Sequence, residues 1–298
     1  AKDFTEAIKN PQNGRAYPNV ITRCTPSNKL DILQWMQSKN YVCAMTGDGV
    51  NDSPSLNHAD VGIAMGTGTS VAKEAADIVL LDDAFPSIVT GVKWGRSLYK
   101  NIQNFLYLQL SINISACLIA IFSPLIGVTM PFTVTQFLWI NLVMDSLAAI
   151  ALASEPAEEK VLLDKPRDKK EFIINKSLGK AIFGFGGFIW ILCVFLLWRG
   201  IDSTIFFATY MTINWWNMFN ARVIGKNKSV FEGLLKNSKF VGILVFILVV
   251  TILIVQIGGE VFNTKPLSAE TWGYILLLTS PICWVKELYH QLIGKRKK

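Results

Sequence analysis

The sequence predicts a protein in two parts. A small α/β unit with a Rossmann-like parallel sheet is expected over residues 1–100, followed by an all-α bundle of six membrane-spanning helices over residues 101–298. Hydrophobic residues make up 51% of the chain, and long apolar runs dominate only from about Gln103 onward. Before that point, short apolar runs alternate with helical patterns, which is typical of parallel strands joined by crossover helices.

The elements of the α/β unit follow from local patterns. A helix is expected to begin at Ser27 or Asn28, because both are good N-caps, and to continue through Lys39 with apolar residues at helical spacing. A second helix is expected over Val71–Ala76, capped by Ser70. Short apolar runs predict strands at Val20–Ile21, Tyr41–Ala44, Val61–Met65 and Ile78–Leu81.

The turn after the second predicted strand carries the strongest chemical pattern. Asp48 and Asp52 flank an amide, Asn51, in the run Thr-Gly-Asp-Gly-Val-Asn-Asp. Ligands of parallel α/β sheets lie beyond the carboxyl ends of the strands, and Mg²⁺ is commonly held there by one or two carboxylates together with phosphate oxygens. The alternative is an acidic turn without a ligand, since Asp and Asn favour turns in any case.

Lys29 is a second candidate, because a cation in the first turn of a helix works against the helix dipole. The alternative is a solvated lysine. The segment Gly66–Ser70 lacks the full glycine pattern and the lysine of a phosphate-binding loop, so a tight strand-to-helix turn is expected there. His58 stands in a polar turn without a second histidine or cysteine nearby, which favours a surface position.

Six apolar runs are long enough to span a membrane, which needs roughly 20 residues. The first is expected to continue a helix that starts in the linker 85–100. The fourth is the weakest, because three asparagines interrupt it. The six predicted spans are 103–126, 132–153, 179–199, 204–222, 240–257 and 271–293.

The basic residues lie mostly beside alternate ends of these spans, so the net charge of +7 indicates membrane orientation rather than nucleic-acid binding. This pattern predicts a multi-pass membrane protein whose α/β unit and both ends are cytoplasmic. The basic tail Lys295–Lys298 is expected to anchor the topology and to be able to touch anionic lipid.

Polar side chains within the spans are costly in lipid and therefore informative. Asn141 and Asp145 are four residues apart, which predicts one shared helical face. Asn113 lies in the first span and Asn214 in the fourth. A carboxylate with facing amides can replace the water around a small hard cation. The alternative is a hydrogen-bonded cluster between helices, and it is stronger for Asn214.

Taken together, these motifs resemble the P-type cation-transporting ATPases. The resemblance rests on Thr46–Asp52 with Pro54, on Ala59–Gly66, on Ala72–Asp77, and upstream on Arg23, Pro26 and Lys29. It covers the chain from the late phosphorylation domain, which has a haloacid-dehalogenase-like fold, through the last six membrane helices. The acidic turn alone would also suit soluble phosphatases of the haloacid dehalogenase superfamily, but six following spans exclude them.

Within the family, Asn141–Asp145 and Ala151–Pro156 resemble calcium pumps, most closely the plasma-membrane type. Phe231 with Gly233, and Gln256–Gly259, fit the same branch. The resemblance implies an enzyme that couples formation and hydrolysis of an aspartyl phosphate to export of Ca²⁺, with Mg²⁺ and ATP as cofactors.

The resemblance also implies roles for individual residues. Asp48 would ligate Mg²⁺, Asn51 and Asp52 would support the aspartyl-phosphate site, and Lys29 would contact the phosphoryl group. Asn141 and Asp145 would bind the transported Ca²⁺, with Asn113 nearby and a weaker contribution from Asn214. Endoplasmic-reticulum-type pumps carry acids after the position of Asn113 and at that of Asn214, so their replacement here implies one transported Ca²⁺ rather than two.

The phosphorylated aspartate, the nucleotide and actuator domains and the first four spans of such pumps are not in this sequence. The missing N-terminal part of the pump is therefore an expected partner, and the 298 residues alone are expected to be inactive. The competing hypothesis is a truncated stand-alone membrane protein that acts as a cation-binding or regulatory module without catalysis.

Overall fold

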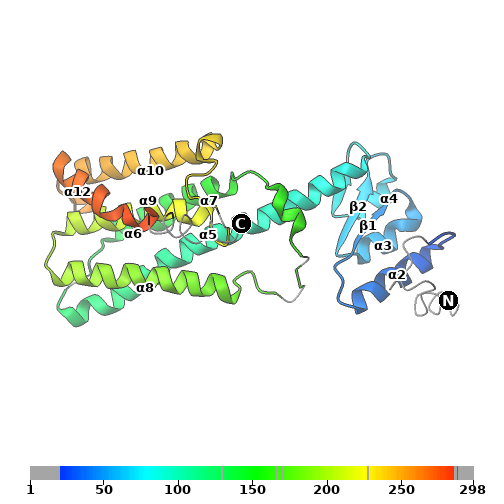
Figure 1. Ribbon diagram of the computed structural model, residues 1–298, viewed down its shortest axis with the longest axis horizontal. Coiled ribbons are helices and arrows are strands. Elements are labelled where there is room, and N and C mark those ends of the chain that lie inside the picture. Colours follow the sequence, from blue (N-terminus) through cyan, green and yellow to red (C-terminus); the bar gives the residue numbers. More distant parts are fainter. Residues whose placement is uncertain are drawn as a thin grey trace. The chain divides into compact units, whose positions relative to one another are not determined.

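The computed structural model describes residues 21–128, 130–165, 167–168, 171–226, 228–284 and 287 (Figure 1). Val20, the first residue of the expected Val20–Ile21 strand, and the tail Lys295–Lys298 lie outside these residues, and Ile21 has no regular structure. The chain divides into two compact units. Unit 1 comprises Ala1–Trp94 with Leu162–Glu171, and unit 2 comprises Gly95–Val161 with Phe172–Lys298.

Unit 1 contains a three-stranded parallel sheet with the strand order β1-β2-β3, which confirms the predicted sheet type. Each strand is followed by a helical crossover or by the start of a helix. The elements are α2 (Pro26–Ser38), β1 (Ala44–Gly47), η1 (Val50–Asp52), α3 (Ser53–His58), β2 (Val61–Met65), α4 (Ser70–Glu74) and β3 (Ile78–Leu80).

The first strand begins later than the apolar run Tyr41–Ala44 predicts. Ala44 pairs with Val61 and Gly47 with Ala64, so the ladder reaches the acidic turn directly. Before the strand, the Cys43 N–H donates to the Asp60 carboxylate at 2.8 Å. The apolar run was misleading because Tyr41 is exposed and lies beside an apolar cavity rather than in the sheet.

Both helix caps lie one to three residues earlier than expected. Thr25 caps α2, since its hydroxyl accepts from the Asn28 N–H at 3.2 Å and Pro26 occupies the first helical position, where its lack of an N–H does no harm. Thr69 caps α4 in the same way through the Ala72 N–H at 3.3 Å. Threonine and serine are equivalent by cap chemistry, and the backbone of the preceding turn decides between them.

Unit 2 is helical. The predicted continuous helix through the linker is confirmed, because α5 runs from Phe85 to Phe122 without a break. The remaining elements are η2 (Ser123–Ile126), α6 (Val134–Leu138), η3 (Trp139–Met144), α7 (Asp145–Ala153), η4 (Glu159–Leu163), α8 (Lys176–Trp198), α9 (Ser203–Arg222), η5 (Leu234–Lys236), α10 (Ser238–Ile257), α11 (Gly259–Phe262) and α12 (Ala269–Thr279).

Within the described residues, four helical segments are long and apolar enough to cross a membrane: Phe85–Ile126, Val134–Ala153, Lys176–Trp198 and Ser238–Ile257. They correspond to the first, second, third and fifth predicted spans. The fourth predicted span is helix α9, which has the expected bounds but is too polar to meet the same criterion. The count of six spans is therefore not confirmed.

The sixth predicted span, 271–293, is not one continuous helix. Helix α12 ends at Thr279, and the described residues 281–284 resume a helix after a turn at Ser280. Pro281 explains the break, since proline has no N–H to donate and its ring clashes with the carbonyl four residues earlier. Most of the remaining predicted span lies outside the described residues.

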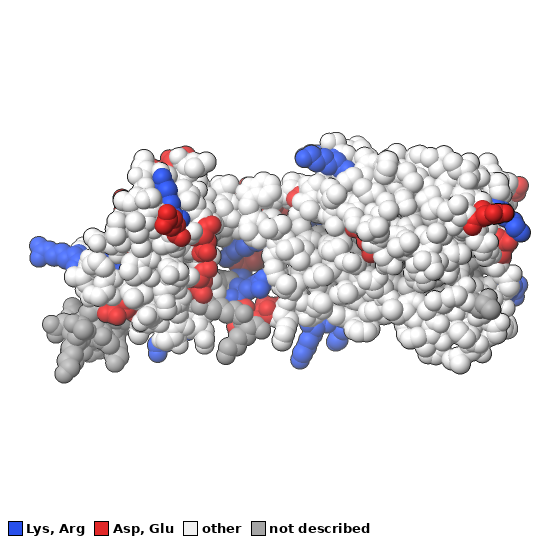
Figure 2. All heavy atoms as spheres, turned by 180° about the vertical axis from the view of Figure 1, so that it is seen from behind, with Lys and Arg blue, Asp and Glu red and all other residues white. Residues whose placement is uncertain are grey.

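Helix α9 is the most buried helix of unit 2 and packs against α8, α10, α12 and α7. Its asparagines therefore face protein rather than the surface. Figure 2 shows that on one face of unit 2 a broad band carries no Lys, Arg, Asp or Glu, whereas charged side chains gather toward its ends. This distribution is typical of a protein surface that contacts the apolar core of a membrane.

Candidate functional site

The acidic turn lies at the carboxyl end of β1, as the parallel sheet requires. Asp48 follows the last residue of β1, and Asn51 and Asp52 form the short helix η1 that leads into α3. The side chains of Asp48 and Asn51 are exposed, whereas Asp52 is only 5% exposed. The turn thus exposes the Asp48 carboxylate and the Asn51 amide to solvent, whereas the Asp52 carboxylate is buried.

Asp52 is held by three donors. Lys29 Nζ lies 2.5 Å from Asp52 Oδ1, and the N–H groups of Asp48 and Gly49 point at Oδ2 at 3.4 and 3.3 Å. Burial acts to raise the pKa of the Asp52 carboxyl. The hydrogen bond from Lys29, the backbone donors and the lysine charge outweigh it and hold this pKa below its ordinary value. Asp52 therefore stays ionised and orients both Lys29 and the turn.

Two glycines allow the turn to close this tightly. A Cβ on Gly47 would lie 2.4 Å from Asp52 Cβ, a distance that packed atoms do not reach. A Cβ on Gly68 would lie 3.1 Å from Asp48 Cα, and the neighbouring Thr69 N–H donates to the Asp48 carbonyl at 2.8 Å. The segment Gly66–Ser70 is thus a turn that packs against the backbone of Asp48 and holds it in place.

Three other aspartates near the sheet were not singled out from the sequence. Asp60, Asp77 and Asp83 each accept a backbone N–H at a strand end, from Cys43, Gly62 and Gly66 respectively. Asp83 also accepts the Thr67 hydroxyl at 2.6 Å. These carboxylates fix the loops around the acidic turn, and their position directly beside strand ends is the sequence signal for that role.

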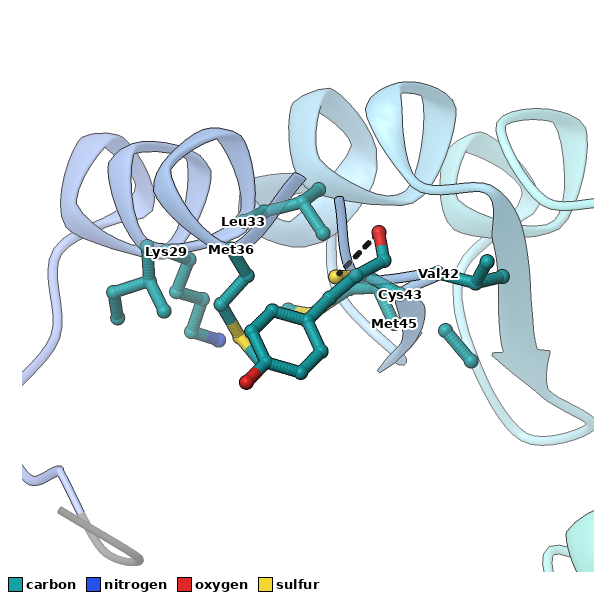
Figure 3. Close-up of a pocket in the computed structure, with 9 residues that line it drawn as sticks. Lys29, Leu33, Met36, Val42, Cys43 and Met45 are labelled. Atoms are coloured by element: carbon teal, nitrogen blue, oxygen red, sulfur yellow. Dashed lines mark hydrogen bonds between the residues drawn. The ribbon is translucent and has the colours of Figure 1, made fainter. Parts of the chain in front are cut away.

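A cavity of 290 Å³ opens between α2 and β1 (Figure 3). Among the described residues, Lys29 is the one charged residue that lines it, and neither Asp48 nor Asn51 contributes to it. Its other lining residues are apolar or aromatic, among them Leu33, Met36 and Met45. This mostly apolar lining offers little to a phosphate group, so we place the chemistry at the acidic turn.

The residues of the acidic turn fit a hard divalent cation. Asp48 offers an exposed carboxylate that takes part in no salt bridge recorded among the described residues, while Asp52 is already neutralised by Lys29. Mg²⁺ binds to one or two carboxylates and completes its octahedron with water or phosphate oxygens. Asp48 is therefore the residue that fits as a ligand, and Asp52 fits as its support.

The second candidate site lies inside unit 2. Asp145 is 3% exposed, and neither of its carboxylate oxygens has a hydrogen-bond partner in the part of the chain that the structure describes. Asn214 is 1% exposed; its amide donates to the Tyr210 carbonyl at 2.9 Å, and its oxygen has no partner among the described residues. Buried oxygens without partners are rare in proteins and call for a ligand or another explanation.

Tyr210 links helix α9, which carries Asn214, to helix α5, which carries Asn113, and sequence reasoning missed it. Its hydroxyl donates to the Ile112 carbonyl at 3.1 Å and lies 3.0 Å from the Ser115 hydroxyl, on the two sides of Asn113 in α5. Tyr210 lies four residues before Asn214, so the shared helical face was the available signal. Helices α5 and α9 thus share a buried polar contact, and α7, which begins with Asp145, packs against α9.

Asn141 differs from Asp145 in its environment, contrary to the expectation of a shared face. Asn141 is exposed on this chain, and its amide donates to the Phe137 carbonyl at 3.2 Å. The two residues are joined by the segment η3, a π-helix over Trp139–Met144 that ends where α7 begins with Asp145. The wider π turn changes the angle between the two residues from its α-helical value.

No group of three or more His, Cys, Asp or Glu side chains that could hold a metal occurs in the described parts of the chain. A cation at Asp145 would accordingly be held by a single carboxylate with amide, hydroxyl or carbonyl oxygens. Such oxygen ligands suit Ca²⁺, which accepts irregular geometries.

Comparison with known proteins matches both parts of the chain to known families. Residues 30–89 match the model of the haloacid dehalogenase-like hydrolases, and residues 129–292 match the model described as cation transporting ATPase, C-terminus. The second match covers more than half of the chain, and the chain belongs to the cation-transporting ATPase family, of which it represents the C-terminal portion.

Among the relatives, the chain is 38% identical to the plasma membrane calcium-transporting ATPase 1 of Mus musculus and of Homo sapiens, over 93% of its own length and 26% of theirs. It is 37% identical to the plasma membrane-type calcium-transporting ATPase 12 of Arabidopsis thaliana, over 88% of its own length and 26% of that protein. The chain thus spans about a quarter of the length of these relatives.

Proposed function

We propose that this chain is part of an ATP-driven calcium transporter that couples formation and hydrolysis of an aspartyl phosphate to export of Ca²⁺ across the plasma membrane. The observation that carries the proposal is Asp145, a buried carboxylate without a partner among the described residues, in a chain similar over 93% of its length to plasma membrane calcium-transporting ATPases. A buried ionisable group between membrane helices is by default a functional site.

The acidic turn supplies the proposed catalytic residues. Asp48 would hold Mg²⁺, and Asn51 beside it would contact the phosphorylated group. Mg²⁺, when bound, would neutralise phosphate charge, which is the main requirement of phosphoryl transfer. Lys29 uses one of its three donors on Asp52, and the other two are available to phosphoryl oxygens. ATP itself would contact mainly parts of the pump other than this chain.

The transported Ca²⁺ would bind at Asp145, with Asn113 and Asn141 contributing and Asn214 as a weaker ligand. Asn214 could offer its amide oxygen as a ligand, because its amide nitrogen is bonded to the Tyr210 carbonyl and the oxygen has no partner among the described residues. In the proposed topology unit 1 and both chain ends are cytoplasmic, which is supported by the basic residues beside alternate helix ends.

The experiment is Asp145→Asn in the natural protein that contains this sequence, assayed in membrane vesicles for Ca²⁺-dependent ATP hydrolysis and Ca²⁺ uptake. We expect both to fall at least tenfold, because the amide keeps the shape of the side chain but removes the carboxylate of the candidate site. Ser146→Ala is the matched control, since Ser146 is the exposed neighbour whose hydroxyl only returns to the Leu142 carbonyl. An unchanged Ca²⁺ response in Asp145→Asn would contradict the proposal and favour a module without catalysis.

A further inference from the structure

A buried ion pair lies at the ends of the helices that carry the candidate cation ligands. Arg222 Nε lies 2.7 Å from Glu155 Oε1, and Arg222 Nη2 lies 3.3 Å from Glu155 Oε2. Arg222 is 1% exposed and Glu155 is 4% exposed. The two parallel bonds form a fork between a planar guanidinium and a carboxylate, which fixes direction as well as distance.

The surroundings of the pair satisfy its remaining atoms. Asn237 Nδ2 donates to Glu155 Oε1 at 3.0 Å, and Arg222 Nη1 donates to the Val230 carbonyl at 3.3 Å. The Arg222 guanidinium also lies 4.8 Å from the centre of the Phe240 ring. A buried ion pair is tolerated only when its other donors and acceptors are paired in this way.

The pair connects the helices of the candidate cation site. Glu155 follows the end of α7, whose first residue is Asp145, and Arg222 is the last residue of α9, which carries Asn214. The Asn101 side chain of α5 donates to the Glu155 carbonyl at 3.1 Å. At 1.5 Å of rise per residue, Asp145 lies about 15 Å along the chain from Glu155 and Asn214 about 12 Å from Arg222.

Stability alone does not account for a charged pair at this place. Replacing a buried ion pair by apolar residues of similar volume is often neutral or stabilising, so such a pair is weak evidence for stability and better evidence for a fixed register. A slide of α7 against α9 by one residue, about 1.5 Å, would break the fork. The same slide would move the Asp145 carboxylate relative to Asn214.

We propose that Glu155 and Arg222 are positioning residues for the transported cation, which fix α7 against α9 so that Asp145 and Asn214 converge on one site. The pair does not touch the cation. The proposal rests on the function proposed above. It adds that cation binding also depends on an ion pair between two residues that are not ligands.

The test is Glu155→Gln in the natural protein, measured in vesicles for both the KM for Ca²⁺ and kcat per folded pump. The glutamine keeps the shape and the bonds to Asn237 but removes the charge. We expect the KM for Ca²⁺ to rise at least fivefold while kcat stays within twofold. A merely structural role would lower the amount of pump in the membrane and leave the KM unchanged.

Glu158→Gln is the matched control. Glu158 accepts from Lys226 at 3.0 Å and Lys228 at 2.7 Å, so it is an ion-paired glutamate three residues further on, but it is partly exposed and bound to lysines beyond the end of α9. Its KM for Ca²⁺ should stay within twofold of the parent value. A KM in Glu155→Gln that matches this control overturns the proposal.

Arg222→Lys decides the question if Glu155→Gln does not accumulate in the membrane. Lysine keeps the charge but cannot form the fork, so we expect at least a threefold rise in KM, and an unchanged KM overturns the proposal. Asp145→Asn, measured in parallel, distinguishes a failure of the proposed function from a failure of the positioning role. If it abolishes the Ca²⁺ response while the Glu155 and Arg222 variants retain the parent KM, only the positioning role is wrong.

Discussion

Asp52 and Asp145 are both buried aspartates, but their surroundings differ. Asp52 accepts from Lys29 and from two backbone N–H groups, whereas the Asp145 oxygens have no partner among the described residues. The first arrangement gives hydrogen-bond donors to both carboxylate oxygens, so Asp52 can orient Lys29 and the acidic turn. The second leaves both oxygens without a donor, which is why we assign the cation to Asp145 and a structural role to Asp52.

The Lys29–Asp52 pair gives a prediction with a pH dependence. Because the pKa of Asp52 is held below its ordinary value of 3.8, the pair stabilises unit 1 at neutral pH, and this stabilisation is lost as the pH falls below that value. Lys29→Met should lower the local opening free energy at pH 7 by about 1–2 kcal/mol, allowing for the partial exposure of Lys29.

The measurement is hydrogen–deuterium exchange of the backbone amides of residues 43–52, corrected for intrinsic rates, at pH 7 and near pH 3. The difference between parent and Lys29→Met should shrink at the lower pH, because the stabilisation by the pair is lost as Asp52 takes up a proton. Lys39→Met, an exposed lysine at the end of the same helix, is the control and should change neither value. Equal protection in Lys29→Met and the parent at pH 7 would show that the pair contributes nothing.

Candidate site residues could be predicted where their chemical type and their position after a predicted strand indicated the same role. Asp48, Asn51 and Asp52 are at the end of a parallel strand, where the fold places ligands. The partners were not predictable, since the pairing of Lys29 with Asp52 depends on how α2 packs on the sheet. Tyr210 and the Glu155–Arg222 pair join segments more than sixty residues apart, and a single sequence carries no signal for such contacts.

At the scale of elements, the apolar patterns located the helices and strands well and their ends less well. β2 has the predicted bounds, whereas β1 is shifted toward the acidic turn because register with β2, rather than hydrophobicity, sets its limits. The π-helix over Trp139–Met144 could not be predicted, since its residues Trp-Ile-Asn-Leu-Val-Met also suit an α-helix. Tertiary contacts at both ends select the wider turn.

Those contacts give a prediction for the π-helix. The start of α6 is anchored by Thr135 and Gln136, which donate to the Val261 and Phe262 carbonyls at 2.6 and 2.8 Å. Deleting Leu142 would remove one residue from the π turn and convert it toward α-helical geometry, which changes the angle between Asn141 and Asp145 while the start of α6 stays anchored. We expect the KM for Ca²⁺ of the natural protein to rise at least tenfold.

The control for the deletion is Leu142→Ala, because Leu142 is exposed and its side chain packs little within the chain. The substitution should leave the KM for Ca²⁺ within twofold of the parent in the same vesicle assay. If the deletion variant keeps the parent KM, the π-helix has no part in placing Asp145.

At the scale of the whole molecule, the open question is whether α9 crosses the membrane. Leu163 lies between α7 and α8, and Leu235 lies between α9 and α10; both are exposed. If α8 and α9 both cross, these positions face the same side of the membrane. If α9 does not cross, they face opposite sides. The basic residues around both positions favour the first arrangement.

Cysteine labelling distinguishes the two arrangements. In a background without the five native cysteines, Leu163→Cys and Leu235→Cys should both react with a membrane-impermeant maleimide only from the cytoplasmic side. Leu125→Cys, in the exposed turn after α5, should react only from the opposite side. Labelling of Leu235→Cys from the opposite side would remove α9 from the set of spans.

The burial of α9 also has a consequence for biogenesis. A helix that carries Asn214, Asn217, Asn220 and Arg222 on buried positions is poorly suited to partition into lipid alone as the ribosome delivers it. Its polar groups find partners on α5, on α10 and in the residues after α12, including the Ile282 carbonyl, which accepts from Asn220 at 3.0 Å. Partners of α9 thus lie both before and after it in the chain, so we expect its membrane integration to be completed only when the later segments have been synthesised.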